Sequence, residues 1–147
     1  MGHARRIGHG GGVMYEDDPL TLLREMAAKR VLVEVALSSN DWILGIKGKR
    51  HPLAMYLKYG VPVALVTDDA GVARSTMTQE FQKAVEDHGV DYRTLKRMVT
   101  DSLEYSFADE ATRTRLKSDL AAAFRAFEQR TQATNPEPPA LSPQPPE

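Results

Sequence analysis

The chain has 147 residues, a formal net charge of −1, 41% hydrophobic residues and 27% charged residues. These proportions are typical of a soluble globular protein and exclude disordered, collagen-like and membrane-embedded classes. Because the charge is mixed and nearly neutral, it gives no electrostatic basis for binding nucleic acid or an anionic membrane, and neither is expected as a partner.

Three absences narrow the class further. Cysteine does not occur, which excludes disulfide bonds and thiolate metal sites. No apolar run reaches the roughly 18 residues of a membrane helix. The basic start at Arg5 and Arg6 has no apolar segment behind it, so a signal peptide is not expected. The compartment stays open, with the cytoplasm as the default expectation.

Strand and helix patterns alternate along the first half of the chain, and only helices follow. In chain order, the patterns predict a strand near residues 5–8, a helix over 19–29, a strand over 31–37, a short helix over 51–59, a strand over 62–67, and helices over 78–88, 92–106 and 109–129. Alternation of this kind predicts parallel strands, adjacent in chain order, in either an open doubly wound sheet or a barrel.

Polar or glycine residues follow each predicted strand, and the carboxyl ends of parallel strands are where sites are built. The first strand ends in Gly8-His9-Gly10, which fits neither the dinucleotide fingerprint nor the phosphate loop. His9-Gly10-Gly11-Gly12 resembles an esterase oxyanion loop, but the chain has no Gly-x-Ser-x-Gly elbow. His9 is therefore a candidate for close approach to a ligand, and a turn with an incidental histidine is the alternative.

The second strand is expected to end in Ser38-Ser39-Asn40 and the third in Asp68-Asp69. Because neighbouring residues on a strand point to opposite faces, one aspartate could bind a metal while the other faces a substrate. Helix capping or turn formation is the alternative for this pair. Of the other histidines, His51 is expected to cap or pack, and His3 and His88 to lie at the surface.

Taken together, Arg6-Ile7-Gly8-His9-Gly10, Ser38-Ser39-Asn40, His51-Pro52, Gly60-Val61-Pro62-Val63 and Thr67-Asp68-Asp69 resemble the adenosine deaminase family, from about Arg6 to about Phe127. The resemblance implies a (β/α)₈ TIM barrel, of which these strands are the sixth to the eighth. It also implies one zinc ion and the hydrolysis of a purine nucleoside, adenosine, to inosine and ammonia. Asp68 matches the zinc-ligating aspartate, and Asp69 matches the aspartate that contacts N7 of the purine. His9 matches the histidine that orients the attacking water and takes up its proton.

Two motifs of that family, His-x-His and His-Ala-x-Glu, are absent, and with them the remaining zinc ligands and the proton-donating glutamate. A full barrel takes about 250 residues. We therefore expect a truncated gene product, a misplaced start or a fragment, and a chain that is inactive alone. It would need a missing amino-terminal half, or it would self-associate through its unpaired strand edges. The predicted domains are a partial barrel over residues 1–131 and a disordered proline-rich tail over 132–147.

Two alternatives stay open at this point. One is a related zinc hydrolase that acts on another purine, such as adenine or a modified nucleoside. The other is a non-catalytic relic that acts as a binding or oligomerisation module.

Overall fold

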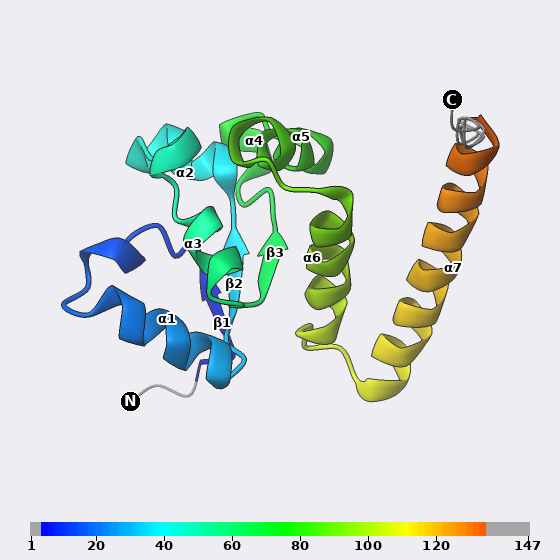
Figure 1. Ribbon diagram of the computed structural model, residues 1–147, viewed down its shortest axis with the longest axis horizontal. Helices are drawn as coiled ribbons and strands as arrows, with labels where there is room; N and C mark the ends of the chain where they lie inside the picture. Colours follow the sequence, from blue (N-terminus) through cyan, green and yellow to red (C-terminus); the bar gives the residue numbers. More distant parts are fainter. Residues whose placement is uncertain (1–3, 135–147) are drawn as a thin grey trace, which may run out of the picture. The chain divides into compact units, whose positions relative to one another are not determined.

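A computed structural model describes residues 4–134 of the chain (Figure 1). Its sheet contains the strands β1 (Arg6–Gly8), β2 (Leu32–Val35) and β3 (Val63–Leu65), which are parallel and lie in the order β1-β2-β3. The register places Ile7 opposite Val33 and Val33 opposite Val63. The predicted parallel α/β arrangement, with adjacent strands followed by helices, is confirmed.

The helices are α1 (Pro19–Ala28), α2 (Leu37–Leu44), α3 (Leu53–Lys58), α4 (Ala70–Ala73), α5 (Met77–His88), α6 (Tyr92–Glu104) and α7 (Glu110–Thr134), with 3₁₀ turns at η1 (Val13–Tyr15) and η2 (Gly48–Arg50). Local sequence explains several of their ends. Asp18 accepts a hydrogen bond from the Thr21 backbone N–H before α1. Thr76 and Gln79 form a capping box at α5, and Gly89, with φ 65°, is the C-cap residue of that helix.

The second strand is shorter than the sequence predicted. It ends at Val35, and Ser38-Ser39-Asn40 belong to α2 instead of the strand end. The reason lies far along the chain, because the buried carboxylate of Glu80 accepts hydrogen bonds from the backbone N–H groups of Leu37 (2.7 Å) and Ser38 (3.2 Å). These acceptors satisfy the free N–H groups that a helix start requires. The short helix α4 was not predicted either.

Strands β2 and β3 are buried, as expected of a parallel sheet that is covered on its faces. Helix α6 packs against β3. The main hydrophobic cluster joins strand residues to side chains of the surrounding helices, among them Leu23, Met26, Val33, Val35, Leu53, Tyr56, Val63, Leu65 and Met98. This rigid core holds the strand ends, where the candidate residues lie.

The chain divides into two compact units, residues 1–108 and 109–147. In the second unit, the Asp109 carboxylate accepts a hydrogen bond from the Thr112 N–H at the start of α7, which continues to Thr134. The predicted division at residue 131 stays a prediction, and most of the proposed tail, residues 135–147, lies outside the described residues. None of the described helices is long and apolar enough to cross a bilayer.

Candidate functional site

The structure brings His9 and Asp68 together. His9 follows β1 and Asp68 follows β3, and the Nε2 atom of His9 lies 3.8 Å from Oδ2 of Asp68. Both residues are in the left-handed region, with φ of 63° for His9 and 53° for Asp68. That conformation costs a non-glycine residue on the order of 1–3 kcal/mol and is concentrated at functional sites. The two strand ends therefore hold an imidazole and a carboxylate facing each other.

The backbone around His9 explains the glycine beside it. The His9 N–H donates to the carbonyl of Glu34 (2.8 Å), and the Tyr56 hydroxyl donates to the carbonyl of Gly10 (2.6 Å). A Cβ atom at Gly10, where φ is +61°, would lie 2.5 Å from the Tyr56 hydroxyl oxygen and 2.8 Å from Cγ1 of Val33. Only glycine fits this close approach, so Gly10 fixes the turn that carries His9.

Asp68 is oriented by α2. The Ser39 hydroxyl donates to Oδ2 of Asp68 at 2.6 Å, and Ser39 itself is buried. This hydrogen bond is the main reason why the pKa of Asp68 is lowered from its ordinary value. The Asp68 side chain is ionised near neutral pH and partly exposed, which suits a group that binds a cation.

Asp69 lies at the N-cap position of α4 and is exposed. The expectation that Asp68 and Asp69 alternate across a strand was wrong, since β3 ends at Leu65 and both aspartates lie in the turn that follows. Asp69 occupies the position of a helix cap, but its side chain makes no capping hydrogen bond.

Sequence reasoning did not find that Asn40 is the next neighbour of His9. The fully buried Asn40 amide lies between two imidazoles, 2.8 Å from Nδ1 of His9 and 2.8 Å from Nε2 of His51. Its place in the polar triplet after the second predicted strand was a signal of a site, but nothing in the sequence pointed to the histidine pair.

The expectation that His51 caps or packs is confirmed. Its ring is buried, and Nδ1 accepts a hydrogen bond from the Leu53 N–H at 3.1 Å. Burial, helped by the nearby His88, lowers the pKa of His51 to about 4. His88, which was expected at the surface, is partly buried, and its ring packs edge-on against His51 with centroids 5.9 Å apart. His3 lies outside the described residues.

The described residues around His9 and Asp68 do not provide a complete set of metal ligands. Among residues 4–134, no group of three or more His, Asp or Glu side chains is arranged to hold a metal. A catalytic zinc site usually has three protein ligands and an open position. Asp68 is a suitable single ligand, with His9 beside it, but the described residues do not form a zinc site on their own.

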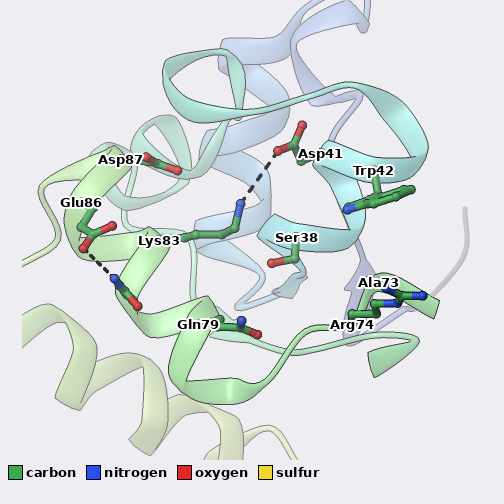
Figure 2. Close-up of a pocket in the computed structure, with 10 residues that line it drawn as sticks. Ser38, Asp41, Trp42, Ala73, Arg74, Gln79, Lys83, Glu86 and Asp87 are labelled. Carbon is green, nitrogen blue, oxygen red and sulfur yellow. Dashed lines mark hydrogen bonds and ion pairs between the residues drawn. The ribbon is translucent and has the colours of Figure 1, made fainter. Parts of the chain in front are cut away.

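A polar hollow of about 420 Å³ lies elsewhere on the first unit (Figure 2). Residues of α2 and α5 contribute most of its lining, including Ser38, Asp41, Trp42, Gln79 and Lys83. Figure 2 shows the Lys83 ammonium directed towards Asp41, with 3.8 Å between the charged atoms. None of His9, Asp68 and Asp69 lines this hollow, so the strand ends remain the better candidate.

The family model for adenosine deaminase matches residues 2–123. An adenosine deaminase of Clostridium perfringens is 31% identical over 118 residues, which cover 80% of this chain and 35% of that protein. An adenine deaminase of a Chelativorans species is 33% identical over 117 residues, which cover 78% of this chain and 35% of that protein. The chain thus spans about a third of the length of the curated relatives that it matches.

Solved structures show the same fold. A zinc-containing amidohydrolase from Burkholderia ambifaria superimposes with a TM-score of 0.76 at 16% identity, covering 89% of this chain and 36% of that one. At this identity the similarity concerns the fold alone.

Proposed function

The chain belongs to the adenosine deaminase family, and from this premise we propose that it is the part of a zinc-dependent purine deaminase that forms the last three strands of the (β/α)₈ barrel. The observation that carries this proposal is the 3.8 Å approach of His9 to Asp68 at the strand ends. These are the residues that the family resemblance assigns to catalysis and zinc binding, and they come from strands that are not neighbours in the sheet. The parallel sheet supports the proposal, because sites of (β/α)₈ barrels lie at the carboxyl ends of the strands.

The three residues would have distinct roles in the complete protein. Asp68 would supply one zinc ligand through its ionised carboxylate. The ion, when bound, would supply the activation of the attacking water. His9 would contact that water, and Asp69 would contact N7 of the purine. Because the other ligands and the proton donor are missing from this chain, we expect it to be inactive alone.

The proposed reaction is the hydrolysis of an amino group at C6 of a purine, with adenosine and water giving inosine and ammonia. Adenine or another purine is the alternative substrate, since the Chelativorans relative is an adenine deaminase and is 33% identical. The proposed contacts of His9, Asp68 and Asp69 concern the metal, the water and the base. They do not discriminate between a nucleoside and a free base.

The remaining candidate is a non-catalytic binding or oligomerisation module. Its support is the sheet, in which β1 and β3 each pair only with β2 among the described residues. Either the missing part of the barrel or a second copy of the chain would pair with those edges. The amount of zinc bound when the chain is joined to the rest of a barrel distinguishes this candidate from part of an enzyme.

The test begins with the isolated chain. After refolding with zinc, the chain should contain less than stoichiometric metal by mass spectrometry. It should also convert no adenosine to inosine above background in an absorbance assay. Robust deamination by the isolated chain would contradict the proposal.

The second arm is a chimera in which residues 2–123 replace the matching third of the Clostridium perfringens adenosine deaminase. Zinc and turnover should both be present in the chimera, with adenosine and adenine assayed in parallel. Asp68→Ala should remove both, whereas the control Asp17→Ala, at an exposed position before α1, should remove neither. If the chimera binds zinc equally well with Asp68→Ala, the assignment of Asp68 as a ligand is wrong.

A further inference from the structure

A continuous row of hydrogen bonds connects the backbone of α3 to His9. The Leu53 N–H contacts Nδ1 of His51 at 3.1 Å, and Nε2 of His51 contacts the Asn40 amide at 2.8 Å. The other end of that amide contacts Nδ1 of His9 at 2.8 Å. From this geometry we propose that His51 is a positioning residue that acts through Asn40 and holds His9 in the tautomer protonated on Nε2.

The direction of the row is set at its backbone end. A backbone N–H can only donate, so Nδ1 of His51 must offer a lone pair to Leu53. The pKa of His51 is lowered to about 4 by burial, and its ring is therefore neutral at pH 7. A neutral imidazole with a lone pair on Nδ1 carries its proton on Nε2. His51 consequently donates to Asn40.

The orientation of the Asn40 amide follows from this donor on His51. Its oxygen must face His51, and its NH₂ group must face His9. The two ends of an amide have nearly the same shape, so the hydrogen bonds decide its orientation. The structure places Nδ2 towards His51 and Oδ1 towards His9, and in that orientation His51 faces two donors, Leu53 N–H and Asn40 Nδ2, while carrying one proton of its own. One donor would then oppose another, and a 180° rotation of the buried amide removes that conflict.

The orientation of the Asn40 amide in turn determines which nitrogen of His9 carries the proton. Its Nδ1 accepts from the Asn40 NH₂ group, so the neutral ring carries its proton on Nε2, the atom 3.8 Å from Oδ2 of Asp68. His9 thus presents a donor to the strand-end site.

One consequence rests on the proposed function, although the tautomer itself does not. If His9 contacts the attacking water through Nε2, it donates a hydrogen bond to that water in the resting state.

The test reads the tautomers directly by long-range ¹H–¹⁵N NMR of the full chain at pH 7, with histidines labelled with ¹⁵N and assigned by single His→Gln variants. His9 and His51 should each show a lone-pair nitrogen at Nδ1 and a protonated nitrogen at Nε2. Since the opposite tautomer loses a hydrogen bond, the favoured form should predominate about tenfold or more. A wild-type spectrum with His9 protonated on Nδ1 would overturn the proposal, whatever the activity of any zinc-loaded chimera.

The variant Asn40→Asp provides a switch of nearly unchanged shape. A carboxylate can only accept, so Nδ1 of His9 should gain a proton while His51 keeps its proton on Nε2. The control His88→Gln changes the ring packed against His51 but no group of the row, and should leave the His9 pattern unchanged. An unprotonated Nδ1 of His9 in folded Asn40→Asp would contradict control by the amide.

Discussion

His51 is a histidine that the fold keeps uncharged. Its ring is 2% exposed, packs against the partly buried His88 and uses both nitrogens in hydrogen bonds. Burial, with the additional effect of His88, lowers its pKa from 6.5 to about 4. Between these two values the unfolded chain binds more protons than the folded chain, so this residue makes stability depend on pH.

We expect the contribution of neutral His51 to the free energy of unfolding to be fully present above pH 6.5. That contribution should decline as the pH falls towards 4. With about 1.4 kcal/mol per pKa unit, the loss is on the order of 3 kcal/mol when complete. Urea denaturation of the wild type and His51→Gln at several pH values measures it, and the variant should have the flatter profile. His88, whose pKa is also lowered by burial, is the facing titratable group, so His88→Gln measures its share. Equal slopes for the wild type and His51→Gln would contradict this assignment.

Gly10 is the second residue whose role is testable alone. In Gly10→Ala the new Cβ atom would meet the Tyr56 hydroxyl and Val33 at a backbone φ of +61°. We expect a loss of about 2 kcal/mol or more in the free energy of unfolding, because strain and overpacking add. Gly12→Ala is the matched control, since Gly12 has φ −89° and no atom near the position of a Cβ. Equal stabilities of the two variants would show that the Gly10 turn is not tightly packed.

At the scale of elements, α5 determines where α2 begins. Glu80 is buried on α5, and its carboxylate accepts from the backbone of Leu37 and Ser38. Helix α2 carries both Ser39, which orients Asp68, and Asn40, which contacts His9. The start of α2 therefore contributes to the geometry of the candidate site.

We expect Glu80→Ala to lower the free energy of unfolding by about 3 kcal/mol, because it leaves buried N–H groups without an acceptor. Glu80→Gln should cost less, since one side-chain oxygen remains to accept. Glu86→Ala on the same helix removes an exposed hydrogen bond with Gln82 and should cost about 0.5 kcal/mol or less. Chemical denaturation of the three variants provides the comparison. A Glu80→Ala variant as stable as Glu86→Ala would contradict the proposed cap.

The helices α5 and α2 show what the sequence could and could not predict. Strand order and most helices followed from local periodicity. The start of α2 did not, because its acceptor, Glu80, lies 43 residues beyond Leu37. At the site, His9 and Asp68 could be selected because each follows a strand. The contact of Asn40 with His51 could not, since folding alone brings those side chains together.

At the scale of the whole molecule, the sheet ends in two edges. Among the described residues, β1 and β3 each have one strand partner, and both partners are β2. The unpaired backbone groups of such edges are templates for pairing with another strand. A chain with two such edges therefore has a reason to associate with a further strand, either of a second copy or of another polypeptide.

We expect the isolated chain to self-associate as its concentration rises, and Ile7→Lys to weaken that association. Ile7 lies in the middle of β1 and is 37% exposed, and lysine on an edge strand opposes pairing through its charge and hydration. Val85→Lys is the control, because Val85 is similarly exposed, at 46%, but lies on the helix α5 and not on a strand. Sedimentation velocity over a range of concentrations should show a rising average sedimentation coefficient for the wild type and Val85→Lys, and a lower one for Ile7→Lys. If both lysine variants reduce association equally, the contact is hydrophobic and not specific to the strand edge. A wild-type chain that stays monomeric at every concentration would contradict edge pairing altogether.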